Sequence, residues 1–197
     1  MTNRPPCSSV RLGRTCLILL FALPAGCHRS ASQIELTSYK DPYFPEPFHV
    51  SFDDCTYRID AGGDIDIAAE ATTATPDQAG SITQLLHVHV FWQPRPGVTF
   101  ANKNTSDATI RYIVVTPRGM ASYRGTGFVL PKWKRHKLHA SIESANLRLE
   151  AQRGDVSELF GDARLQGRLN PRQDEHATVE RMRALDLHAN EQPPPPQ

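Results

Sequence analysis

Hydrophobic and polar residues alternate along much of the chain, and this pattern restricts the fold more than any other feature of the sequence. Successive side chains of a β-strand point to opposite faces, so alternation predicts strands with one buried and one exposed face. The alternating runs are residues 48–52, 65–71, 85–92, 110–115, 121–130 and 163–169. Runs of this length, separated by turn residues, are typical of an antiparallel all-β domain.

Two segments between or within these runs predict how the strands are joined. Thr116-Pro117-Arg118-Gly119 has Pro and Gly at positions that favour a tight turn, so we expect it to close a hairpin. The hydrophobic residues change from even to odd numbers within Glu143–Asn146, which predicts a bulge or a turn there. This run, residues 138–151, counts as one strand or two and brings the total to seven or eight. Seven or eight strands predict an antiparallel β-sandwich that is immunoglobulin-like in architecture, with a distorted barrel as the alternative.

The first 27 residues have the composition of an export signal. Three arginines and no acidic residue precede a nine-residue apolar stretch at residues 15–23. This stretch is too short for a membrane-spanning helix, which needs about 20 residues, and is typical of a secretory signal. The segment ends in Leu23-Pro24-Ala25-Gly26-Cys27. This ending resembles the signal of bacterial lipoproteins, in which a branched aliphatic residue and two small residues precede a Cys.

The resemblance implies that Cys27 is the lipid-attachment site. In the family the Cys thiol receives a diacylglycerol, the signal is cut before it, and the new amino terminus is acylated. The alternative is an ordinary cleaved signal and secretion without an anchor. The lipoprotein interpretation places the exported protein on a bacterial cell membrane, inner or outer, and the membrane is then its first partner. An envelope protein or polymer is a second candidate partner.

The composition adds one exclusion, and the domain organisation follows from the ends of the chain. Lys plus Arg is 22 and Asp plus Glu is 21, so no excess of positive charge points to nucleic acid. We expect a signal peptide at residues 1–26, a lipid anchor and tether at 27–47, and the β-sandwich domain at 48–190. Asp174 precedes hydrophobic residues spaced three apart, which predicts a short carboxy-terminal helix over about 174–188. The Pro-rich residues 191–197 are expected to be a disordered tail.

Motifs that carry catalytic chemistry are not recognisable in the sequence, so we expect neither an enzyme nor a cofactor. Asp64 and Asp66 form one of the tightest acidic pairs, but they alternate with buried Ile65 and Ile67 and are expected on the wet face of a strand. The sequence Gly125-Thr126-Gly127 lies inside a strand pattern and predicts a close backbone approach or a bulge.

Cysteine usage indicates a domain without an internal disulfide. Cys7 and Cys16 lie in the segment that would be removed, so acylation of Cys27 leaves Cys55 as the only thiol of the mature chain. A reactive thiol is one interpretation of Cys55. A small core residue near Tyr57 is the interpretation we favour.

His87 and His89 are the sharpest candidates for a metal site. Residues i and i+2 of a strand share a face, so both imidazoles project together, and a third ligand would have to come from His49, His136 or His139. The alternation of Leu86, Val88, Val90 and Trp92 places these four residues in the core and turns both histidines outward. We therefore expect surface histidines and no metal.

A basic run at Lys132-Trp133-Lys134-Arg135-His136-Lys137 has two interpretations. It could contact anionic head groups or a polyanion beside the membrane. The favoured one is a solvated loop between strands, with Trp133 packed against the sandwich.

These patterns together predict a membrane-anchored, non-catalytic lipoprotein of the cell envelope, which acts by binding or by structural support. The alternative is an exported metal-binding domain that uses His87 and His89.

Overall fold

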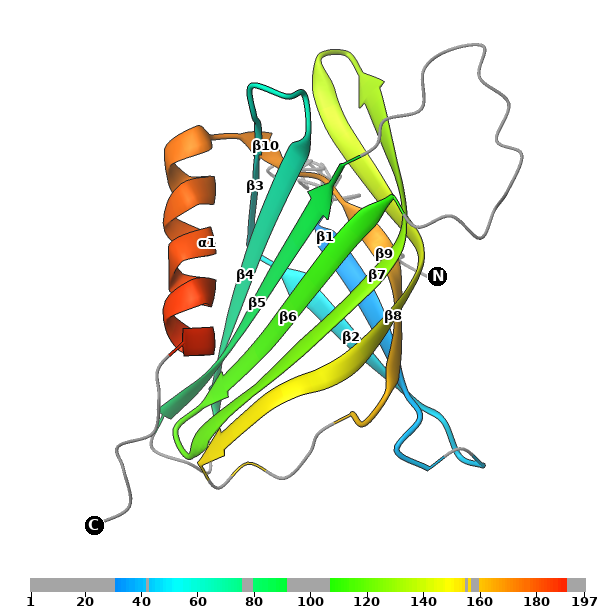
Figure 1. Cartoon of the computed structure of the whole chain (residues 1–197), viewed down its shortest axis with the longest axis vertical. Coiled ribbons are helices and arrows are strands. Elements are labelled where there is room, and N and C mark those ends of the chain that lie inside the picture. Colours follow the sequence, from blue (N-terminus) through cyan, green and yellow to red (C-terminus); the bar gives the residue numbers. More distant parts are fainter. Residues whose placement is uncertain are drawn as a thin grey trace, which may run out of the picture.

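The computed structural model of the protein describes residues 31–41, 43–75, 80–91, 107–154, 156 and 160–190. These residues form strands and one helix (Figure 1). Most of the strands follow one another as a long antiparallel meander, and the first two strands, the last strand and the helix lie outside it. The elements are β1 (Ser32–Ser38), β2 (Glu46–Phe52), β3 (Asp54–Ile59), β4 (Ile65–Thr75), β5 (Gly80–Val90), β6 (Ala108–Thr116), β7 (Gly119–Lys134), β8 (Lys137–Gly154), β9 (Ala163–Leu169), β10 (Arg172–Gln173) and α1 (Glu175–Asn190).

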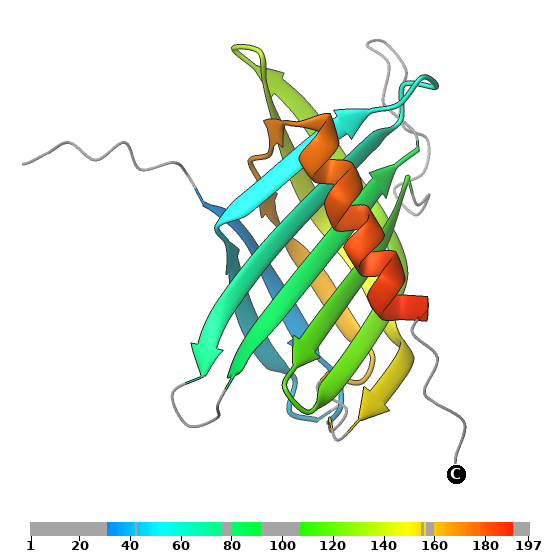
Figure 2. The same cartoon turned by 90° about the vertical axis from the view of Figure 1, so that its left-hand side faces the viewer.

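The strands belong to one hydrogen-bonded sheet in the order β10-β3-β4-β5-β6-β7-β8-β9-β1-β2. Every neighbouring pair is antiparallel except β10 and β3. The chain passes from β2 at one edge to β3 near the other through the single residue Asp53, and β2 lies against β4. The sheet is therefore rolled, so that β1, β2 and β9 face β3 to β6 across a common interior (Figure 2).

The interior of the rolled sheet is filled by side chains from every strand from β1 to β9. Its largest fully buried side chains include Tyr112 and Tyr123. The ring centroids of these two tyrosines and of Phe160 lie 5.4–6.5 Å from one another. The backbone N–H of Phe160 donates to the Tyr123 hydroxyl at 3.2 Å. Close packing of this kind accounts for the strict alternation of the sequence, because a slip of one residue would turn each strand's apolar side chains to the outside.

The predicted all-β class with one short carboxy-terminal helix is confirmed. The two halves of the rolled sheet pack face to face, as the layers of a sandwich do. The immunoglobulin-like architecture is not confirmed, because the strands belong to one continuous sheet rather than to two. Alternation within each strand carries no information about this difference, since it reports which face is buried and not where a sheet ends.

Both predicted features of strand connection are confirmed. Thr116 pairs with Gly119 at the end of the β6–β7 hairpin, which leaves Pro117 and Arg118 as a two-residue turn. The phase change within β8 is a bulge rather than a turn: the pairing of β8 with β9 shifts between Ile142 and Ala145. Strand β8 continues through it.

The amino-terminal boundary of the domain is a correction. Residues 32–47 were expected to be tether, but β1 is hydrogen-bonded on both sides, to β2 and to β9. Its two terminal serines are buried because their hydroxyls are satisfied: Ser38 donates to the Phe160 carbonyl at 2.7 Å, and Ser32 accepts the Asn170 N–H at 2.9 Å. The polar sequence of this segment suggested a tether, but hydrogen bonds to residues far away in the chain hold it as a strand.

Helix α1 packs on the outer face of the sheet over β3, β4 and β5 (Figure 2). The carboxylate of Asp174 accepts the backbone N–H of Ala177 at 3.0 Å, so the predicted cap is confirmed. Leu185 of the helix joins Leu85, Ile113 and Met120 in a second, smaller apolar cluster outside the sheet. The tail at 191–197 lies outside the described residues.

Candidate functional site

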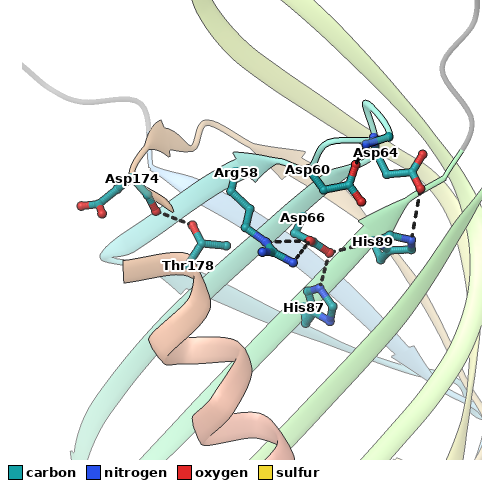
Figure 3. A network of polar contacts seen from close by, with 9 residues as sticks. Arg58, Asp60, Asp64, Asp66, His87, His89, Asp174 and Thr178 are labelled. Atoms are coloured by element: carbon teal, nitrogen blue, oxygen red, sulfur yellow. Dashed lines mark hydrogen bonds and ion pairs between the residues drawn. The ribbon is translucent and has the colours of Figure 1, made fainter. Parts of the chain in front are cut away.

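Asp66 is the centre of a polar cluster on the outer face of the sheet, beside the first turns of α1 (Figure 3). Its Oδ2 accepts a hydrogen bond from Nε of Arg58 at 2.9 Å and forms an ion pair with Nη2 of the same side chain, also at 2.9 Å. Its Oδ1 lies 3.0 Å from Nε2 of His87 and 2.8 Å from Nδ1 of His89. Since the carboxylate only accepts, both imidazoles donate, His87 through Nε2 and His89 through Nδ1. Three side chains from two neighbouring strands thus converge on one carboxylate.

The register of three strands brings these residues together. Asp66 of β4 pairs with Arg58 of β3 on one side and with His89 of β5 on the other. His87 is two residues from His89 on the same face, so both imidazoles reach the same oxygen. The short turn Asp60–Asp64 sets this register: the Asp60 carboxylate accepts the backbone N–H groups of Gly62 and Asp64 at 2.8 and 2.9 Å.

Burial makes Asp66 different from an ordinary surface carboxylate. The residue is only 2% exposed, so the expectation that Asp66 is a wet-face residue is wrong. Burial by itself would favour the neutral acid, but the hydrogen bonds from His87, His89 and Arg58 outweigh it and hold the pKa of Asp66 well below its usual range. Asp64, its neighbour on this face, is half-exposed, with Oδ2 3.9 Å from Nε2 of His89.

The predicted orientation of the two histidines is confirmed, but their surroundings were not foreseen. Leu86, Val88 and Val90 are fully buried in the core, which turns His87 and His89 to the outer face. Trp92 lies outside the described residues. Neither histidine simply faces solvent: their side chains are 14% and 31% exposed, and each has one ring nitrogen committed to Asp66.

The candidate third metal ligands lie on other parts of the sheet. His49 of β2 lies 3.8 Å from Glu35, and Nδ1 of His139 on β8 lies 2.6 Å from Oδ1 of Asn170. His136 is part of the β7–β8 turn. Among the described residues, no group of three or more His, Cys, Asp or Glu side chains is arranged to hold a metal ion.

Helix α1 adds a second polar contact beside this cluster. Arg181 donates to Thr56 at 2.9 Å, contacts the Asp54 carboxylate and lies 3.5 Å from Glu70. Thr178, fully buried, donates to Thr56 at 2.9 Å. The roles of Arg58 and Arg181 were not predicted from the sequence. The short turn after Arg58 could have placed that arginine opposite Asp66, whereas the Arg181 contacts depend on how the helix docks.

A cavity of about 800 Å³ lies at the end of the rolled sheet where β1 begins. Its wall combines apolar side chains, such as Phe52 and Leu138, with the charged side chains of Asp53, Lys137 and Arg172. Ala31 and Ser32, the first residues that the structure describes, line it as well. A site of this mixed character suits a ligand with both an apolar part and a charged part.

Cys55 contributes to the cavity wall as a buried thiol. The residue is 8% exposed, and burial raises the pKa of its thiol to about 11, although a hydrogen bond with Ser32 acts in the opposite direction. Thiol reactivity requires the thiolate, so the favoured interpretation of Cys55 as a small core residue agrees with its position.

The basic run forms the tip of the β7–β8 hairpin. Lys134 pairs with Lys137, and the two turn residues between them, Arg135 and His136, have positive φ angles of 48° and 64°. The ring of Trp133 packs edge-on against Tyr57 at a centroid distance of 5.8 Å and remains 49% exposed. The sequence predicted a loop between two strands, and the structure has the tip of a hairpin there. The tryptophan packs against the domain, as expected.

The two glycines of the Gly125-Thr126-Gly127 segment allow β7 and β8 to approach closely, as predicted. A Cβ at position 125 would lie 1.8 Å from the Asn146 carbonyl oxygen, and one at position 127 would lie 2.5 Å from the Ala145 Cβ. The segment is thus part of the sheet and not a nucleotide loop.

Comparisons with known proteins leave the function to be argued from the chain itself. No protein-family model, curated protein or solved structure matches the sequence or the fold. Within the described ranges, no helix has both the length and the apolar character needed to cross a membrane. Cys27 and the rest of the proposed signal lie outside the described residues.

Proposed function

We propose that the protein is an exported lipoprotein of a bacterial cell envelope, and that its rolled-sheet domain acts by binding rather than by catalysis. The observation that carries the proposal is the short separation between the lipoprotein-like Cys27 and the start of β1 at Ser32. Five residue steps span at most about 18 Å. A diacylglycerol on Cys27 would therefore hold the end of the sheet at which β1 begins close to the membrane surface.

The cavity at this end supports a binding role. Ala31 and Ser32 line it, so the cavity of mixed apolar and charged character lies at the end that the anchor would hold near the membrane. A ligand that partitions to the membrane surface would meet this cavity first. The thiol of Cys55 in its wall is buried and has a raised pKa, which favours a binding site over a thiol-based catalytic one.

The Asp66 cluster supports a structural contribution to the same role. Both oxygens of the carboxylate already accept hydrogen bonds, and those bonds tie β3, β4 and β5 together next to the helix. A satisfied ion cluster rigidifies the scaffold on which a binding site is built.

Labelling with a fatty acid tests the anchor. Wild type, Cys27→Ser and the matched control Cys16→Ser are expressed with a labelled fatty acid, and each is partitioned between detergent and aqueous phases. We expect label and detergent-phase recovery for wild type and Cys16→Ser, and neither for Cys27→Ser. Equal labelling of all three proteins, or recovery of wild type in the aqueous phase, would overturn the proposal.

A further inference from the structure

We propose that the tip of the β7–β8 hairpin, residues 132–137, is a membrane-contact element that binds the anionic head groups of the lipid surface to which the protein is anchored. The proposal deepens the proposed function and rests on it for the identity of the surface. Four observations support it: charge, the exposed tryptophan, the geometry of the turn and the length of the tether.

The tip of the hairpin carries a cluster of exposed cationic side chains. Every residue from Lys132 to Lys137 is exposed. Four of the six are Lys or Arg, and among the described residues none of these four lies within ion-pair distance of a carboxylate. Each basic residue close to an anionic bilayer contributes about a fivefold gain in partitioning. The acidic turn at the same end of the molecule has partners of its own: the Asp60 carboxylate accepts the backbone N–H groups of Gly62 and Asp64, and the Asp64 carboxylate lies 3.9 Å from His89.

Trp133 adds an apolar group with a polar N–H to this positive tip. Its ring packs edge-on against Tyr57, and 49% of the residue remains exposed. Tryptophan is enriched where proteins meet the membrane–water interface, because its ring is amphipathic. A half-exposed tryptophan between two lysines therefore suits a head-group layer better than bulk water.

The turn itself uses residues that its backbone does not favour. A two-residue hairpin turn with both central φ angles positive is most easily made by Asn-Gly. Here Arg135 and His136 occupy these positions, at φ angles of 48° and 64°. Conformations of this kind persist where the side chains are needed. The strained backbone therefore points to a use for the charge at the extreme tip.

The position of the tip matches the reach of the anchor. Ala140 of β8 is level with Leu169 of β9, and the neighbouring Arg168 pairs with Gln33, so Ala140 lies level with Ser32. From that level the hairpin continues for four more residues to its turn, which is about 14 Å at the rise of a strand. This projection, seen at the top of Figures 1 and 2, falls within the maximum of about 18 Å between Cys27 and Ser32. The tip and the acyl chains can therefore reach the same surface.

Fluorescence quenching of Trp133 in vesicles tests the inference. The mature protein is reconstituted into vesicles of phosphatidylcholine, alone or mixed with phosphatidylglycerol, in which a fraction of the lipid carries bromine near the head group. The Trp133→Phe variant provides the signal of the other tryptophan, which is subtracted. We expect quenching of Trp133 in the mixed vesicles and its loss when the ionic strength is raised, because salt screens exposed charge.

Two variants with equal changes of charge separate the hairpin from a general effect. In the hairpin variant, Lys132, Lys134, Arg135 and Lys137 are replaced by Gln. In the control variant, four cations elsewhere are replaced by Gln, namely Arg118, Arg124, Arg148 and Arg164. The hairpin variant is expected to lose the Trp133 quenching, and the control variant to keep it.

Several results would overturn the inference. They are equal quenching in neutral and anionic vesicles, quenching that survives in the hairpin variant, or no quenching of a properly incorporated protein. Retention of the protein on a soluble polyanion without lipid quenching would identify an anionic polymer as the partner instead. If the chain carries no acyl group, the proposed anchor is wrong. The hairpin proposal is then tested by adding vesicles to the soluble protein, and it requires the same pattern of Trp133 quenching.

Discussion

At the scale of single residues, the Asp66 cluster is the feature on which the local structure depends most. We predict that Asp66→Asn lowers the free energy of unfolding by about 3 kcal/mol, because Arg58 would be left without its charge partner in a largely buried site. Urea unfolding measures the change. Asp64→Asn is the control on the same strand face, and its more exposed side chain should cost no more than about 0.5 kcal/mol. Equal effects of the two substitutions would contradict the described role of Asp66.

The pH dependence of stability gives a second test of Asp66. Its pKa in the folded protein lies below the ordinary value of 3.8, so the unfolded chain takes up a proton first as the pH falls. The stabilisation is therefore complete above about pH 4 and is lost as the pH falls toward the folded-state pKa. We predict that the difference in unfolding free energy between wild type and Asp66→Asn shrinks over this range. A difference that grows toward lower pH would contradict the assignment.

The thiol of Cys55 provides a third prediction at this scale. Because burial raises its pKa to about 11, the thiolate is scarce near pH 8. The mature protein should react with a thiol-specific reagent roughly a hundredfold more slowly when folded than in denaturant. Rapid reaction of the folded protein would show that Cys55 is an accessible, active thiol.

The sequence alone predicts part of the structure at the scale of single residues. The alternation of Leu86, Val88 and Val90 correctly turned His87 and His89 outward. The burial of Asp66 could not be predicted in the same way, because the side chains that contact Asp66 come from the two neighbouring strands. Alternation assigns a face to a residue, and neighbouring elements decide whether that face is wet.

At the scale of elements, the β7–β8 hairpin combines a predictable fold with an unfavourable turn. We predict that the double substitution Arg135→Asn and His136→Gly raises the free energy of unfolding by about 1 kcal/mol, because these residues adopt positive φ angles more easily. Thermal or urea unfolding measures this gain. The pair Pro117→Ala and Arg118→Ala in the β6–β7 turn is the control for a general effect of turn substitution, and it should not stabilise. No gain, or a loss, in the variant with Arg135→Asn and His136→Gly would show that the turn is unstrained.

The elements differ in how far the sequence specifies them. The β6–β7 hairpin, the bulge in β8 and the cap of α1 follow from local signals, namely turn residues, a phase change and Asp174. Strand β1 does not, because its polar sequence gives no sign of the two strands, β2 and β9, that pair with it. Its buried serines are satisfied by Phe160 and Asn170, more than a hundred residues away in the chain. Contacts of such range leave no local pattern.

At the scale of the whole molecule, the rolled sheet gives the protein two distinct ends. The end at which β1 begins holds the cavity, the basic hairpin and Ala31, the first residue that the structure describes. The β6–β7 turn lies at the other end (Figure 1), about 50 Å away along β7. The all-β class and the terminal helix followed from the sequence. The closure of one sheet on itself did not, because it depends on how far the strands twist and curl together.

We propose that an acyl anchor on Cys27 holds the hairpin end of the domain at the membrane, and site-specific fluorescence quenching distinguishes this end from the opposite one. A single cysteine is introduced at Lys134 in the hairpin or at Arg118 in the opposite turn, and is labelled with a fluorophore in the reconstituted mature protein. Cys55 is buried, so the introduced cysteine takes the label. Quenching by a head-group quencher in the vesicle should be strong at position 134 and absent at position 118. Equal quenching at both positions, or stronger quenching at position 118, would contradict the proposal that the hairpin end of the domain faces the membrane.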